Sequence, residues 1–426
     1  MPALQDISNT FRLRLEQLGT ADVAIGLTAD EKLYGPESLQ AVAAAIGSVP
    51  AIQKAVVFHT GTVSIDSNER VSFVSVPSSA ADGMRSALIP PISYYRALFE
   101  AADGLQCRAC AALSSDPAHL SSDEMQALIK PVLSSNADMV VAQYAERKLD
   151  ALMNRSILYP LARALYGKRL RFPMAGDFAV SPKFVQMLQA IAATPQGADT
   201  RLMSLEAIRR DLDIAQATFG PRRLSPVESA PDPSTVLSQV AGSLFLDIER
   251  NAAHWQRTRG SRPVPVIGTA PALLQEDDTP TQVDGLIETF RLAYRNLMEV
   301  WPLLLPPGTL VELRRLTTTE LDRFRLPDRT WVRIVYDFAL GYRIRVISRD
   351  HLLGAMTPLP RVGGVACTRD PDWDSGRSSA AGGTALRGLR SREALPDLAM
   401  EMAGPVQPVS MQENEQDVGS STSCTQ

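Results

Sequence analysis

The sequence contains few cysteines, little net charge and no long apolar run, and each absence excludes a class of protein. Four cysteines in 426 residues cannot form the dense disulfide framework of a small secreted domain. A formal net charge of −4 gives no electrostatic reason to bind nucleic acid. No apolar stretch approaches the roughly 20 residues of a membrane-spanning helix, and the N-terminus lacks the apolar core of a secretory signal. We therefore expect a cytoplasmic protein with no membrane span and no nucleic-acid partner.

Several catalytic signatures are also missing. The sequence has no H-E-x-x-H, no G-x-S-x-G and no P-loop, so zinc protease, α/β-hydrolase and P-loop NTPase functions have no basis in it. Cys107 and Cys110 form a single C-x-x-C with no second pair at a zinc-ribbon spacing. A small hydrophobic residue in a strand is the favoured interpretation of Cys110, ahead of a redox or metal role.

The first part of the chain alternates strand-like and helix-like segments. Strands are expected at residues 23–27, 55–59, 71–76, 108–113 and 137–144, and helices at 36–46, 93–102 and 122–133. Strands separated by helices of this length predict βαβ units and an α/β fold with a mostly parallel sheet.

The pattern changes after Pro226. Helices are expected at residues 236–257, 283–301 and 331–347, and the stripe Trp331, Val335, Phe338, Tyr342 predicts the core of a helix bundle. From residue 358 the chain is rich in Gly, Ser, Ala, Arg and Pro, a composition that cannot bury enough apolar surface to fold. We therefore expect an N-terminal helix (1–20), an α/β domain (21–225), a helical domain (226–357) and a disordered tail (358–426).

The most informative stretch is residues 139–181. A strand ending at Tyr144 is followed by N-x-x-x-x-Y-P-L-x-R-A-L-Y-G-x-R-x-R, then by an A-G-D-F turn and by Ser181-Pro182, which signals a helix start. With these motifs and the run WVRIVYDFALGYRIRVISRDHLL at residues 331–353, the chain resembles GT-A-fold, family-2-like glycosyltransferases. The resemblance is to the mannosylglycerate synthase and glucosyl-3-phosphoglycerate synthase type.

The resemblance implies a Rossmann-like GT-A domain that binds a nucleotide-sugar donor at the carboxyl ends of its strands. A D-x-D motif in such enzymes holds Mg²⁺ or Mn²⁺, which neutralises the departing diphosphate. The matching segment here is Ser114-Ser115-Asp116. Asp116 keeps the metal-binding carboxylate, whereas Ser114 replaces the first acid and supplies no charge. The resemblance therefore implies a weakened metal site.

The donor side shows both matches and departures. Ser64 and Asp66 match donor-binding positions, but Gly61 replaces an expected acid. An expected lysine near residues 81–84 and an expected metal-binding histidine near residues 219–224 are missing. Lys168 and Arg169, with Arg171, form a basic cluster that could meet the donor diphosphate or the acceptor. A solvated helix end is the alternative interpretation.

The acceptor side is better preserved. Arg147 and Asp150, just beyond the strand end at Tyr144, resemble residues near the acceptor pocket, although Arg147 could equally be a surface arginine. Asp199 matches another acid of the family, and it also stands where a helix N-cap belongs. Asp177, in the A-G-D-F turn, is the strongest catalytic candidate, because a carboxylate there could orient or activate an acceptor hydroxyl.

Two functions remain open. The first is an active glycosyltransferase that moves a hexose from a nucleoside diphosphate-sugar to a small hydroxylated, anionic acceptor. The second is a binding or scaffold protein that keeps the fold but has lost turnover, which would explain the missing donor-side groups together. The sequence leaves the choice between monomer and homo-oligomer open.

Overall fold

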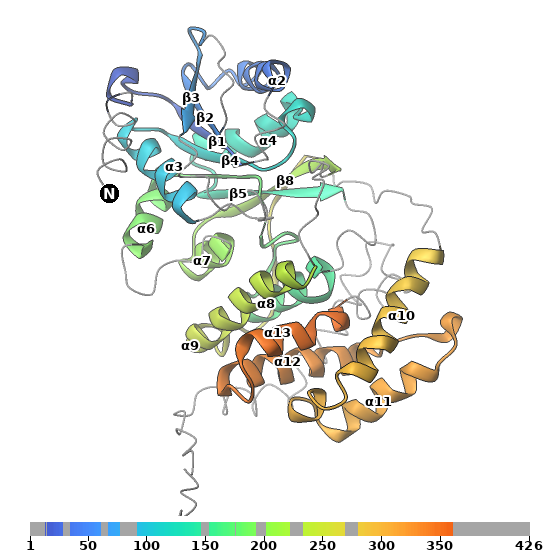
Figure 1. The fold of residues 1–426 in the computed structure, drawn as a ribbon. Coiled ribbons are helices and arrows are strands. Elements are labelled where there is room, and N and C mark those ends of the chain that lie inside the picture. Colours follow the sequence, from blue (N-terminus) through green and yellow to red (C-terminus); the bar gives the residue numbers. More distant parts are fainter. Residues whose placement is uncertain are drawn as a thin grey trace, which may run out of the picture.

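An eight-stranded sheet organises the first half of the chain. The computed structural model describes residues 13, 15–28, 35–60, 67–76, 92–145, 153–174, 176–192, 202–221, 233–268 and 280–360. Figure 1 shows the sheet in the upper part of the molecule. Its strand order is β10-β8-β5-β7-β4-β1-β2-β3. Its strands are β1 (Val23–Leu27), β2 (Ala55–Thr60), β3 (Val71–Val76), β4 (Ala109–Leu113), β5 (Met139–Ala145), β7 (Phe178–Val180), β8 (Ile214–Pro221) and β10 (Val266–Ile267).

Neighbouring strands are parallel except around β7, which is antiparallel to both β4 and β5. The order 3-2-1-4-5 is that of a Rossmann sheet, with one antiparallel strand inserted between the fourth and fifth. The predicted α/β, Rossmann-like fold is therefore confirmed. β7, β8 and β10 are not among the strands that the sequence predicts.

Helices cover both faces of the sheet, which explains why the central strands are apolar throughout. On one face, α2 (Pro36–Gly47) and α4 (Ser122–Leu133) pack on residues such as Ile25 and Val57. On the other, α3 (Ile92–Gly104) and α6 (Pro182–Ala192) pack on residues such as Val56 and Phe178. Three further elements complete this second face: the π-helical turn Asn154–Leu158, α5 (Tyr159–Tyr166) and α7 (Met203–Arg209).

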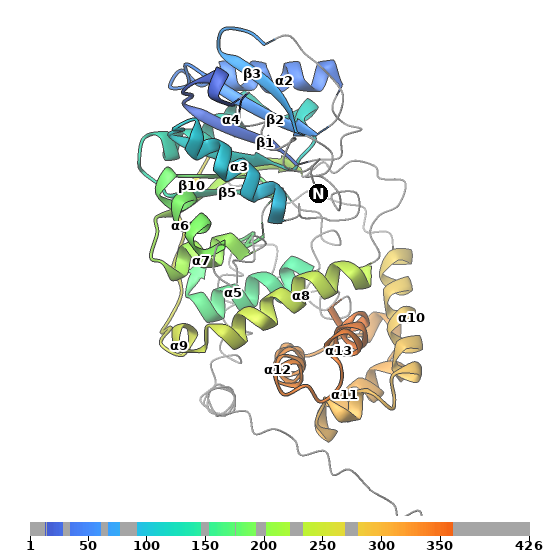
Figure 2. The same cartoon turned by 60° about the vertical axis from the view of Figure 1, so that its left-hand side comes forward.

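From Pro233 the described chain is mostly helical, although the expected helical domain also supplies two short strands, β9 (Arg262–Pro263) and β10, of which β10 joins the main sheet. The helices of this part are α8 (Pro233–Arg250), α9 (Ala252–Trp255), α10 (Pro280–Asn296), α11 (Pro307–Thr318), α12 (Asp328–Ile344) and α13 (Arg349–Met356). Figures 1 and 2 show α8 between the α/β part and the pair α12 and α13, both of which it contacts. None of the described helices is long and apolar enough to cross a membrane.

The helical layer shares one hydrophobic core with the α5 face of the sheet. The predicted stripe of Trp331, Val335, Phe338 and Tyr342 is buried in this core. The indole Nε1 of Trp331 also donates to the backbone oxygen of Ser156, at 2.8 Å, and so ties α12 to the turn that precedes α5. The two parts are therefore joined by packing as well as by sequence.

The ends of the described chain are only partly as expected. In the N-terminal segment, residues 13 and 15–18 are helical, and Leu15 and Leu18 pack against the core, but Leu13 is 60% exposed. At the other end, Leu359 is completely buried, so the packed chain continues at least to this residue. Residues 361–426 lie outside the described part, and the disordered tail stays a prediction.

Candidate functional site

The candidate site lies where the parallel strands end. β1 pairs with β2 on one side and with β4 on the other, so the direction of chain progression reverses between β1 and β4. Ligands of open α/β sheets bind at the carboxyl ends of the strands beside such a reversal. Here the backbone nitrogen and Oγ1 of Thr28 both donate to the carbonyl oxygen of Leu113, at 2.7 and 3.1 Å. The ends of β1 and β4 are thus held together at the expected crevice.

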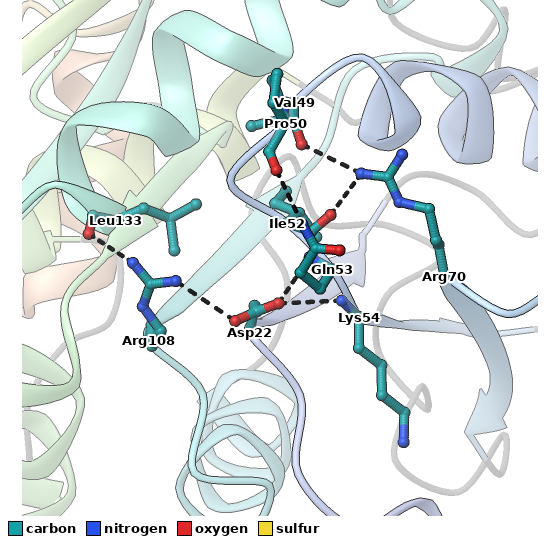
Figure 3. A network of polar contacts seen from close by, with 9 residues as sticks. All are labelled: Asp22, Val49, Pro50, Ile52, Gln53, Lys54, Arg70, Arg108 and Leu133. Atoms are coloured by element: carbon teal, nitrogen blue, oxygen red, sulfur yellow. Dashed lines mark hydrogen bonds and ion pairs between the residues drawn. The ribbon is translucent and has the colours of Figure 1, made fainter.

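At the amino ends of the strands, opposite the candidate site, a polar network holds the sheet together (Figure 3). Asp22, which precedes β1, accepts hydrogen bonds from the backbone nitrogens of Gln53 and Lys54 at 2.7 and 3.0 Å, and pairs with Arg108 at 3.5 Å. Burial alone would raise the pKa of Asp22, but these hydrogen bonds and the charge of Arg108 lower the pKa below its ordinary value. The amino ends of β1, β2 and β4 are therefore fixed by Asp22.

Asp177 is the centre of the candidate site. It stands directly before β7, is fully buried, and lies at the carboxyl ends of β4 and β5 because β7 runs antiparallel between them. Its Oδ1 accepts from the backbone nitrogens of Ser114 and Ser115, at 2.5 and 3.0 Å. Its Oδ2 accepts from the Tyr144 hydroxyl at 2.5 Å and from the Ser115 hydroxyl. One carboxylate thus joins the ends of β4, β5 and β7.

These contacts define what Asp177 can do. A carboxylate offers about four lone-pair positions, and in Asp177 four protein donors occupy them. The Tyr144 hydroxyl in turn accepts from the backbone nitrogen of Asp177, at 3.2 Å. This arrangement favours a positioning role, in which Asp177 fixes the turn that carries Asp116. The predicted role in handling the acceptor hydroxyl stays a prediction.

Tyr144 and Ser115 are part of this network, and sequence reasoning did not select them. The sequence marks Tyr144 only as the end of a strand, and Ser115 only as the middle of the Ser114-Ser115-Asp116 segment. A tyrosine at the end of an otherwise apolar strand was the available signal, since a buried hydroxyl needs a partner.

Asp116 lies at the edge of the network and has a more open carboxylate. Its Oδ1 accepts from the backbone nitrogen of Ala118 at 3.0 Å, which caps the short 3₁₀ turn Pro117–His119, and its Oδ2 lies 3.7 Å from Nε2 of His119. The side chain is 19% exposed. Asp116 is therefore the carboxylate of this turn that is placed to meet a ligand, while Ser114 is buried beside it.

These residues fit a magnesium or manganese ion only in part. Mg²⁺ is usually held by one or two carboxylates together with substrate phosphates. Asp116 can supply one carboxylate, whereas the oxygens of Asp177 are taken by protein donors. Within the ranges that the structure describes, no group of three His, Cys, Asp or Glu side chains converges as a metal site. A metal here would depend on Asp116 and on the phosphates of its ligand.

The other predicted residues divide into two sets. Lys168 and Arg169 form β6, which pairs with β9 (Arg262–Pro263) in a separate two-stranded sheet. Arg163, which the sequence did not suggest, is buried. It lies beside Arg169, because the Nε atoms of both arginines donate to the Ser261 hydroxyl. The remaining predicted site residues, Ser64, Asp66, Arg147, Asp150 and Asp199, lie outside the described residues.

The C-x-x-C pair lies at the amino end of β4, away from the candidate site. Cys107 and Cys110 are buried free thiols that help to line a cavity of about 530 Å³ between α3 and α6. Burial, with a smaller contribution from the charge of Asp22, raises the pKa of Cys107 to about 12, and burial raises that of Cys110 as well. Thiols that stay protonated are poor nucleophiles and poor metal ligands, which favours the interpretation as small hydrophobic residues.

Comparison with known proteins gives a partial likeness to solved structures only. No protein-family model matches the chain, and no curated protein matches it. Glucosyl-3-phosphoglycerate synthase from Mycobacterium tuberculosis, solved with Mn²⁺, UDP and phosphoglyceric acid, is 17% identical, with a TM-score of 0.35. The match covers 55% of this chain and 82% of that one. A structure described as a mycobacterial protein is 18% identical over 56% of this chain and 78% of its own, also with a TM-score of 0.35. Identities and scores this low establish no function, and the fold is assigned from the strand order.

Proposed function

We propose that the protein binds a nucleoside diphosphate-sugar at the carboxyl ends of β1 and β4 and transfers the hexose to a small hydroxylated, anionic acceptor. The observation that carries this proposal is the hydrogen bonding of Asp177 to the backbone of Ser114 and Ser115. Asp177 belongs to the A-G-D-F motif and Ser114 begins the degenerate D-x-D segment, 63 positions earlier. Two separate motifs of the glycosyltransferase resemblance therefore meet beside the chain reversal where such a ligand would bind.

Each residue of the network has a definite task in this proposal. Asp116 would hold Mg²⁺ or Mn²⁺, and the bound metal would neutralise charge on the leaving diphosphate. Asp177 keeps the Ser114–Asp116 turn and Tyr144 in place, so that the Asp116 carboxylate is presented at the strand ends. Preorganisation of this kind matters because a small displacement of a charged group weakens its contact with the developing charge. Arg147, Asp150 and Asp199 remain the proposed acceptor residues.

A second function is binding without turnover. The observations in its favour are the neutral Ser114 next to Asp116 and the four protein donors that occupy the Asp177 oxygens. Asp116 is the single carboxylate of the Ser114–Asp116 turn, so the affinity for a metal ion would be low. A protein of this kind would hold a nucleotide-sugar, or only its nucleotide, without releasing product.

Calorimetric titration with UDP-glucose and GDP-mannose, with and without Mn²⁺, separates these functions. The transferase requires metal-dependent binding of one donor and release of the nucleoside diphosphate when a hydroxy acid is added. Asp116→Asn should weaken metal-dependent binding about tenfold or more, since it removes a charged ligand. The exposed Asp322→Asn is the matched control and should bind normally. Donor binding without product supports the second function, and no binding of either donor would contradict the transferase.

A further inference from the structure

A cluster of three arginines lies beneath the β8 side of the sheet. Arg163 is in α5, Arg169 is in β6 and Arg171 follows two residues later. The Nε atoms of Arg163 and Arg169 donate to the same Ser261 hydroxyl, at 3.2 and 3.4 Å. The guanidinium carbon of Arg171 lies 5.0 Å from the centre of the Tyr159 ring. Three fixed cations are thus gathered around one hydroxyl and one aromatic ring.

The backbone of this region brings the cluster together. Gly167 ends α5 with φ of 67°, a conformation that favours glycine. A Cβ at this position would lie 2.8 Å from the carbonyl oxygen of Gly260, so only glycine lets the neighbouring turn approach so closely. The backbone nitrogen of Arg262 then donates to the carbonyl oxygen of Gly167, at 2.8 Å. This close approach places Ser261 between Arg163 and Arg169.

The cluster has the electrostatics of an anion site. No ion pair joins Arg169 or Arg171 to a carboxylate in the part of the chain that the structure describes. Burial lowers the pKa of Arg163, Tyr159 raises it, and the charges of Arg169 and Arg171 lower it again. The three cations therefore repel one another in a partly desolvated place. An oxyanion would relieve this repulsion and would match the planar fork of a guanidinium.

We propose that Arg169 and Arg171, together with Arg163 and the Ser261 hydroxyl, form a binding site for a phosphate or carboxylate group of the acceptor. The proposed function is needed only to name the acceptor as the molecule that carries the anion. The anion site itself does not depend on it. The lateral position of the cluster in the sheet favours the acceptor over the donor diphosphate. The backbone nitrogen of Arg171 is bonded to Gln216 of β8, at 2.7 Å, and β8 is three strands away from β4. Strands are spaced by about 4.8 Å, so Gln216 lies on the order of 14 Å across the sheet from β4. That separation leaves room for a hexose and a small acid between the two anions.

Binding of inorganic phosphate to the full-length protein tests the site without donor, metal or acceptor. Isothermal calorimetry at constant ionic strength, with chloride as the balancing anion, measures the dissociation constant. Arg169→Gln/Arg171→Gln should weaken phosphate binding about tenfold or more, because it removes two charge-assisted contacts from half-buried side chains. Arg314→Gln/Arg315→Gln on the exposed face of α11 removes the same charge and should leave the dissociation constant within about twofold.

A second titration with UDP and Mn²⁺ distinguishes the acceptor from the donor. We expect Arg169→Gln/Arg171→Gln to change UDP binding by less than about twofold while phosphate binding is lost. An equal loss of UDP binding would overturn the assignment to the acceptor. Phosphate that binds no better than chloride, or equally well to both double variants, would overturn the site itself. If UDP binds to none of the proteins but phosphate binding depends on Arg169 and Arg171, the proposed function fails and the anion site stands.

Discussion

Replacing Asp177 tests whether this carboxylate holds the site together. In Asp177→Ala four buried or half-buried donors lose a charged acceptor, and each such hydrogen bond contributes roughly 1.5–3 kcal/mol. The total loss of stability should be smaller than the sum of these four contributions. Removing the carboxylate also removes the cost of its desolvation, and water can reach Ser115. Removing one partner of a buried charged network typically costs about 3–5 kcal/mol, and we expect a loss in that range. Asp177→Asn should lose only about 1–2 kcal/mol. Its remaining oxygen can still accept from both backbone nitrogens, while the amide can donate to the hydroxyls of Tyr144 and Ser115.

Urea unfolding followed by circular dichroism gives these free energies. Tyr144→Phe, alone and combined with Asp177→Asn, forms a double-mutant cycle in which we expect a coupling energy of about 1–2 kcal/mol. The exposed Asp322→Asn should stay within about 0.5 kcal/mol of the wild type. A loss below about 1 kcal/mol in Asp177→Ala would refute the positioning role. Unchanged stability in Asp177→Asn with complete loss of sugar transfer would show that Asp177 acts on the acceptor directly.

Three further predictions concern other parts of the molecule. Gly167→Ala should destabilise the protein by at least about 1–2 kcal/mol in the same urea assay, since alanine is strained at φ of 67°. Gly104 has open space for a Cβ, so the control Gly104→Ala should be neutral or slightly stabilising. In a variant that lacks Cys367 and Cys424, the buried thiols of Cys107 and Cys110 should resist a thiol reagent at pH 8 and should react once the protein is unfolded. Fast labelling of the native protein would contradict their raised pKa values. The lowered pKa of Asp22 means that the stabilising effect of this carboxylate is present at neutral pH and is lost as the pH falls through the folded-state pKa. The difference in unfolding free energy between wild type and Asp22→Asn should therefore shrink below pH 3.8. A difference that stays constant with pH would count against the stabilising role of the Asp22 charge.

The elements that the sequence predicted are those with a strong local signal. The buried strands from Val23–Leu27 to Met139–Ala145 are short apolar runs or, in β3, an alternating run, and the helices carry apolar faces with the expected spacing. β7 gave no such signal, because it has three residues and exists only through its pairing with β4 and β5. The pairing also decides the site, since it places Asp177 against Ser114. Sequence reasoning selected Asp177, Ser114 and Asp116, but it could not find Tyr144 as their partner.

The sequence by itself determined the α/β pattern, the helical second half and the motifs that resemble a glycosyltransferase, because these depend on residue spacing along the chain. Tertiary structure alone decided that the Asp177 oxygens are filled by protein donors and that Arg163, Arg169 and Arg171 gather around Ser261. The physical reason is that hydrogen bonds and charge repulsion depend on distances between atoms. Those distances are set by strand order and by the close approach of Gly167 to Gly260.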